Sequence, residues 1–91
     1  MTSLSRELLI INKRGLHARA SAKFVQTVET FDASITVSKD GMTVGGTSIM
    51  GLMMLAAGPG SSIMVAASGA QAEEALRTIE ALIADRFGEE M

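Results

Sequence analysis

The sequence predicts an α/β (α+β) fold of the open-faced β-sandwich type, in which a four-stranded antiparallel sheet carries three helices on one face. Two observations lead to this prediction. Segments with strand and helix patterns follow one another in the order βαββαβα, and no internal repeat, linker or low-complexity segment divides the 91 residues. We therefore expect residues 1–91 to form a single domain whose core removes more than ~60% of the unfolded chain's surface from water.

The first strand is predicted over Arg6–Asn12, where an unbroken apolar run of four residues leaves open which face is buried. A helix follows from Ala18 to about Glu29, and Gly15 and Leu16 form the turn that leads into it. Apolar side chains recur along this helix at the spacing of an amphipathic stripe, which comprises Ala20, Phe24, Val28 and Phe31.

A β-hairpin is predicted next. Residues 34–38 alternate between polar and apolar side chains, as in a strand that is buried on one face. Asp40 and Gly41 favour a type I′ turn, and the third strand covers Met42–Gly45.

A short helix from Ile49 to about Ala56 follows, with Ser48 as its N-cap and a Gly-Pro-Gly sequence at residues 58–60 to end it. This helix is apolar almost all round its axis, so it cannot bury every side chain. We expect Leu52 and Leu55 to face the core. The outward side would then carry a soft patch that suits several partners in turn, made of Ile49, Met50 and Met53. The alternative is that these methionines simply fill the core.

The fourth strand is predicted over Ser62–Ala67, and a long amphipathic helix completes the fold. The apolar positions of this helix are Ala72, Ala75, Leu76, Ile79, Leu82, Ile83 and Phe87. Glu73 and Glu74 in its first turn complement the helix dipole, and Gly88 is placed to end it.

Composition argues against several classes of function. Without cysteine the chain has neither a disulfide framework nor a thiolate metal site, and we predict no metal and no cofactor. The net charge of −2 and the presence of only three aromatic residues argue against nucleic-acid binding. The apolar run at residues 49–57 is far shorter than the ~20 residues that span a bilayer, and the N-terminus lacks an export pattern. We therefore expect a cytoplasmic protein without membrane insertion. As a separate expectation, we take the protein to be a monomer.

The reactive groups of the chain gather around its only histidine, His17. The positive end of the predicted first helix is crowded by three cations, Arg14, Arg19 and Lys23. Each poorly screened charge there should destabilise the helix by about 0.3–1 kcal/mol. This placement becomes useful when an anion binds, because free backbone N–H groups and guanidinium groups form a phosphate-sized receptor. A neutral imidazole there can accept a phosphoryl group on nitrogen, with Arg19 stabilising the transferred charge. The alternative is a surface or capping histidine with solvated basic neighbours.

Two segments resemble the signatures of a known family. Residues 15–25 (GLHARASAKFV) resemble the active-site signature of the HPr family. The members of this family are the histidine-containing phosphocarriers of the bacterial phosphoenolpyruvate-dependent phosphotransferase system. The regulatory-serine segment of the same family resembles residues 48–53 (SIMGLM), about thirty residues further on. The resemblance covers residues 6–87 in length, order of elements and both motifs. Two departures are Ala20, where many members have proline, and Arg14, where some have a neutral polar residue.

The resemblance implies a phosphocarrier, not an enzyme. In that role His17 would accept a phosphoryl group from phospho-enzyme I, with the help of Arg19, and pass it to a IIA-type acceptor. The family also implies phosphorylation of Ser48 by an HPr kinase/phosphorylase in lineages that have one, although a helix N-cap worth ~1 kcal/mol explains a serine there equally well. The residues expected to dock partners are Ile49, Met50, Met53, Ala18 and Lys23.

Three classes of function compete. The first is this phosphocarrier. The second is a regulatory binding protein of a nitrogen-type phosphotransferase system that is not coupled to sugar transport. The third is an enzyme with His17 as general base, for which the sequence shows neither a third, orienting group nor a substrate cleft. The first two share their chemistry and differ in the acceptor, so the sequence does not separate them.

Overall fold

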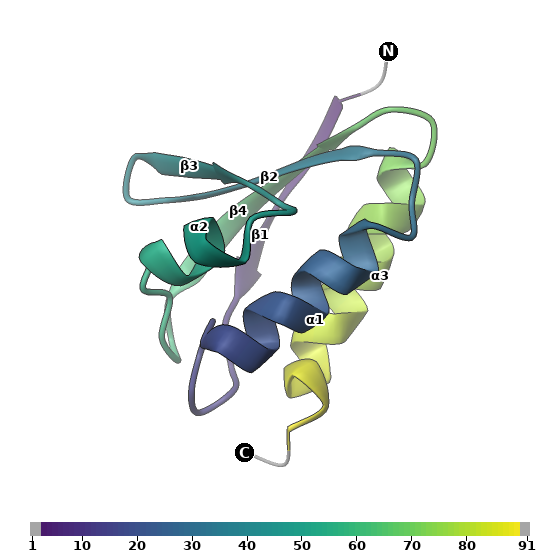
Figure 1. Ribbon diagram of the computed structural model, residues 1–91. Coiled ribbons are helices and arrows are strands. Elements are labelled where there is room, and N and C mark those ends of the chain that lie inside the picture. The colour runs from purple at the N-terminus through teal and green to yellow at the C-terminus, as the bar shows by residue number, and fades with distance from the viewer. Residues whose placement is uncertain (1–2, 90–91) are drawn as a thin grey trace.

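The computed structural model describes residues 3–89 and confirms the predicted α+β fold (Figure 1). Within this range an antiparallel four-stranded sheet has the strand order β1-β4-β2-β3. The elements are β1 (Ser3–Leu9), α1 (Ala18–Val28), β2 (Ser34–Lys39), β3 (Met42–Gly45), α2 (Ile49–Met54), β4 (Ser62–Ser68), α3 (Ala72–Ala84) and a short 3₁₀ turn, η1 (Arg86–Gly88).

The helices cover one face of the sheet, and the core lies between the two layers (Figure 1). In the middle of the sheet, Val37 of β2 lies opposite Val65 of β4, and both side chains are fully buried. The predicted hairpin turn is confirmed, because Asp40 and Gly41 have φ values of +51° and +83°, as a type I′ turn requires. Leu52 of α2 and Leu55, the C-cap residue of that helix, are buried, as predicted.

The first strand differs from its prediction, which was Arg6–Asn12. It begins at Ser3, opposite Ser68, so that β1 pairs along the whole length of β4 and Leu4 packs against the core. Backbone hydrogen bonds continue to Ile10, but Asn12 has already left the sheet and is buried in the loop that follows. The partner strand, and not the apolar run, therefore decides where β1 begins and ends.

The last helix also differs, because α3 ends at Ala84 and does not continue to Phe87. Arg86 and Phe87 have φ values of +54° and +55°, which turn the chain out of the helix. Phe87 is nevertheless buried, with 1% of its surface exposed. Gly88, which we expected to end the helix, lies in this turn with a φ of +78°. The ends of the other elements agree with their predictions to within two residues.

Candidate functional site

His17 is the N-cap of α1. Its backbone is extended, and its Nδ1 accepts a hydrogen bond from the backbone N–H of Arg19 at 3.3 Å. The capping geometry considered for this histidine is therefore present. This cap places Nδ1 at the helix end whose backbone N–H groups have no partner within the helix and can bind an anion.

The loop before His17 is held against the segment that follows α2. The backbone N–H of Leu16 donates to the carbonyl oxygen of Ala57 at 2.9 Å. Gly15 has a φ of +63°, and a Cβ on it would lie 2.2 Å from the same oxygen. Only glycine allows this approach, so Gly15 fixes the position of His17 relative to α2.

The other ring nitrogen of His17, Nε2, contacts the carboxylate of Glu89. Asn12 donates through its Nδ2 to Glu89 Oε1 at 3.0 Å and to the carbonyl oxygen of Gly15 at 2.9 Å. The hydrogen bond from Asn12 has the largest effect and lowers the pKa of the Glu89 carboxyl. Burial opposes it, and His17 and Arg14 each add a smaller lowering effect, so that the pKa stays below its ordinary value. Glu89 is thus ionised at neutral pH beside the imidazole.

The sequence showed no third group that could orient His17, and in the structure Glu89 occupies that place. Sequence reasoning missed both Glu89 and Asn12. A polar residue directly after an apolar strand was a weak signal for Asn12. Nothing in the sequence pointed to Glu89, which lies 72 positions from His17.

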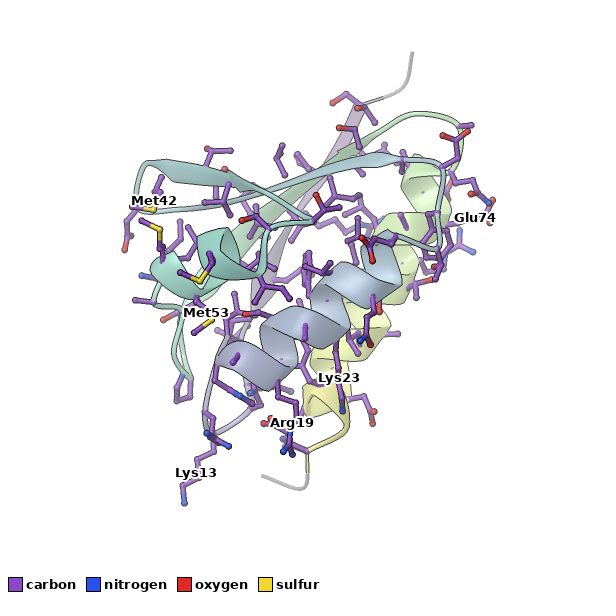
Figure 2. All side chains as sticks on the ribbon, in the orientation of Figure 1. Lys13, Arg19, Lys23, Met42, Met53 and Glu74 are labelled. Carbon is purple, nitrogen blue, oxygen red and sulfur yellow. The ribbon has the colours of Figure 1, made fainter. Side chains whose placement is uncertain are left out.

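The cations around His17 lie in different surroundings. Figure 2 shows Arg19 at the start of α1 and Lys23 one turn further along, beside the end of the described chain. The Arg19 side chain is exposed and forms no ion pair within residues 3–89. Lys23 donates through Nζ to the carbonyl oxygen of Phe87 at 2.6 Å. Arg19 is therefore available to an anion, whereas Lys23 holds the C-terminal turn.

Ser48 is the N-cap of α2, as predicted, and its Oγ accepts a hydrogen bond from the Gly51 N–H at 2.9 Å. Ser48 is exposed at the start of α2. Its position allows modification without disturbing the core.

The outward side of α2 is apolar, as predicted. Met50 is 70% exposed and Met53 is 40% exposed, and Met54, which was not among the predicted docking residues, is 65% exposed. We call this surface the methionine patch, and it consists of Ile49, Met50, Met53 and Met54. The interpretation of these methionines as core residues was wrong.

A shallow groove of about 310 Å³ joins the methionine patch to His17. Met53 lines it from α2, Arg14 and His17 line it from the loop that leads into α1, and Ala56 lines it from the segment after α2. Figure 2 shows Met53 on the side of α2 that faces α1. A partner that covers the patch would therefore also reach the imidazole. Ala18, another predicted docking residue, is exposed next to His17.

Two further properties concern only the part of the chain from residue 3 to residue 89. It contains no group of three or more histidine, aspartate and glutamate side chains that could hold a metal ion. None of its helices is both long enough and apolar enough to cross a membrane.

Comparison with known proteins identifies the family. A family model described as "PTS HPr component phosphorylation site" matches residues 4–85. The chain is 50% identical over 86 residues to the phosphocarrier protein HPr of Cupriavidus necator, covering 94% of this chain and 97% of that protein. It is 40% identical over 89 residues to the phosphocarrier protein NPr of Shewanella violacea, covering 98% of each chain.

The fold agrees with these matches. The crystal structure of HPr-C-His from Thermoanaerobacter tengcongensis superposes with a TM-score of 0.89 and 42% identity, over 100% of both chains. Fold and sequence together define a phosphocarrier of the bacterial phosphotransferase system. The chain belongs to the HPr family, as its two motifs predicted. This membership supports a carrier function and not an enzymatic one.

Proposed function

We propose that this protein accepts a phosphoryl group on His17 from phospho-enzyme I and passes it to a IIA-type acceptor. The observation that carries the proposal is the position of His17 Nδ1 at the N-terminus of α1, beside the exposed Arg19. The match to the family's phosphorylation-site model includes both residues.

For this phosphoryl transfer the protein needs to supply only positioning and charge stabilisation. The lone pair of Nδ1 attacks phosphorus, an N–P bond forms, and the bond from phosphorus to the donor nitrogen breaks, with its electron pair left on the donor. The N–H groups of α1 and the Arg19 guanidinium stabilise the charge spread over the equatorial phosphoryl oxygens. Transfer to the acceptor reverses these steps with a new nucleophile.

The methionine patch and the groove beside it would dock donor and acceptor in turn. Methionine side chains adapt their shape to different partners, which suits a carrier that must fit at least two. Ala18 extends this surface toward His17. Lys23 would contribute at its edge, where its amino group already bonds Phe87.

Phosphorylation of Ser48 would regulate docking. A phosphoserine carries about −1.5 to −2 charges, and it would lie directly beside Ile49 and Met50. A partner that covers the patch would have to remove water from this dianion, so binding should weaken. This regulation requires an HPr kinase/phosphorylase in the source organism.

The alternative is a nitrogen-type system in which the phosphorylation state controls regulatory partners. The similarity to a protein named NPr favours keeping this alternative. Its chemistry is the same, and only the acceptor differs. Phosphorylated protein offered to IIA proteins of the sugar and nitrogen types would separate the two, because the cognate acceptor receives the label faster.

The central proposal is tested with phosphoenolpyruvate and a cognate enzyme I. Wild type should gain one phosphoryl group in an acid-labile bond, as expected for a phosphoramidate, and His17→Ala should gain none. Unchanged labelling of His17→Ala would overturn the proposal. An acid-stable label would also overturn it, because it would point to a hydroxyl.

A further inference from the structure

We propose that Glu89 is a positioning residue that keeps the hydrogen of the His17 imidazole on Nε2, so that Nδ1 presents a lone pair that can exchange its 3.3 Å hydrogen bond from the Arg19 N–H for the phosphoryl group. The inference rests on the proposed function and adds to it a group from the C-terminal end of the fold. It follows from the hydrogen-bond donors and acceptors around the two ring nitrogens.

The carboxylate of Glu89 is oriented by Asn12. Both hydrogens of the Asn12 amide nitrogen are engaged, one by the carbonyl oxygen of Gly15 and one by Glu89 Oε1. A flipped amide would set its oxygen against these two acceptors, so the buried side chain has one favourable orientation. Oε1 is therefore committed to Asn12, and Oε2 is left facing His17 Nε2.

The two sides of the ring require the same tautomer. An ionised carboxylate only accepts hydrogen bonds, so Nε2 must carry a hydrogen to pair with Glu89. On the other side, the N–H of Arg19 donates to Nδ1, which must therefore present its lone pair. Glu89 and the helix N-terminus thus select Nδ1 as the nucleophile together.

Glu89 is held in place by the fold. Phe87 anchors the preceding turn in the core, and Lys23 binds its carbonyl oxygen at 2.6 Å. The backbone N–H of Glu89 donates to the carbonyl oxygen of Arg86 at 2.9 Å, which closes the turn. Because the core and α1 both fix this turn, the Glu89 carboxylate is held in one position beside His17.

The role of Glu89 continues after transfer. With a phosphoryl group on Nδ1 and a hydrogen on Nε2, the ring carries positive charge, and the carboxylate faces that charge from the side away from phosphorus. Arg19 stabilises the negative charge on the phosphoryl oxygens, whereas Glu89 stabilises the positive charge on the imidazole ring. The two residues therefore have separable effects.

The first test is nitrogen NMR of the imidazole in the free protein, at a pH where the ring is neutral. Wild type should show the Nε2–H tautomer. In Glu89→Gln the new side chain should turn its oxygen to Asn12 and its amide nitrogen to His17, which favours the opposite tautomer. Glu89→Ala should give a mixture. The matched control is Glu80→Gln, which removes the same charge from an exposed position on α3 and should match wild type.

The second test is the initial rate of phosphorylation by enzyme I, with the melting temperature of each variant measured alongside. Glu89→Gln should be about 10-fold slower than wild type, which is the lower end of the effect known for residues that orient metal-bound histidines through the same kind of carboxylate hydrogen bond, while Glu80→Gln should be unchanged.

The proposal is overturned if wild type and both Glu89 variants share one tautomer population. It is also overturned if Glu89→Gln is phosphorylated as fast as wild type or faster, since the carboxylate would then be dispensable or would repel the phosphoryl group. A wild type that takes no label would instead overturn the proposed function. The tautomer spectra need no phosphoryl donor and would still decide the role of Glu89.

Discussion

The Cα of Gly15 packs so closely on Ala57 that a Cβ at Gly15 would lie 2.2 Å from the Ala57 carbonyl oxygen. This contact joins the loop that carries His17 to the segment that follows α2. It explains how two regions far apart in the sequence, the reactive histidine and the methionine patch, come to share one groove.

Gly15→Ala should therefore destabilise the fold by roughly 2–5 kcal/mol, from the left-handed backbone together with the steric clash. Gly41→Ala is the matched control, because Gly41 has a φ of +83° but no atom within 4 Å of the place that an added methyl group would take. It should lose only about 1–2 kcal/mol. Chemical denaturation measures both, and an equal loss for the two variants would contradict the role given to the contact with Ala57.

Arg19→Ala should slow phosphoryl transfer from enzyme I roughly 10²-fold, the scale for removal of a group that stabilises transition-state charge. Its melting temperature should stay equal or rise slightly, because a cation leaves the positive end of α1. Arg77→Ala, which removes the same charge from an exposed pair with Glu73, should keep the wild-type rate. Normal transfer with lowered stability would reverse the assignment of Arg19.

Ser48→Asp should slow phosphorylation of His17 without unfolding the protein, because the added charge lies beside the docking patch but at the favourable end of α2. Ser48→Ala should lose ~1 kcal/mol from the missing N-cap and keep its transfer rate. The rate with enzyme I and the melting temperature are measured for both variants and wild type. The prediction fails if Ser48→Asp transfers normally, or if its slowing is accompanied by a collapse in melting temperature.

Met53→Gln should raise the KM for phosphorylation by enzyme I roughly 5-fold, equal to about 1 kcal/mol of lost docking energy, with little change in kcat. Met64→Gln is a close control, since Met64 is 41% exposed and Met53 40%, but Met64 lies on the open face of the sheet away from the helices. Steady-state kinetics of the two variants give the comparison. Equal effects would place the docking surface elsewhere.

Glu89 should make stability depend on pH. The hydrogen bond from Asn12, with His17 and Arg14, lowers the pKa of this carboxyl in the folded protein below its ordinary value of 4.5. The ionised Glu89 carboxylate therefore adds its full contribution to the free energy of unfolding above pH 4.5. This contribution is lost as the pH falls through the lowered pKa of the folded state. The stability difference between wild type and Glu89→Gln should shrink on acidification. Urea denaturation over this pH range measures it, and a difference that grows in acid would contradict the assigned interactions.

The sequence by itself determined the local features of this protein. The spacing of Ala20, Phe24 and Val28 predicted the buried side of α1, and Ser48 predicted the start of α2. The side of α2 that carries Leu52 and Leu55 was also predicted correctly. Such features depend on residues within one or two turns of each other, whose periodicity and capping chemistry can be seen directly in the chain.

Only the tertiary structure decided how His17 is surrounded. Its contact with Glu89 spans 72 positions and requires α3 to stop at Ala84 and the chain to turn at Arg86 and Phe87. Neither of these two residues is a type that favours a left-handed turn, so the local sequence pointed to a continuing helix. Burial of Phe87 in the core and its bond to Lys23 accompany this backbone conformation, and both depend on elements that are distant in the sequence. A contact made through packing across the whole fold leaves no periodic pattern in the chain.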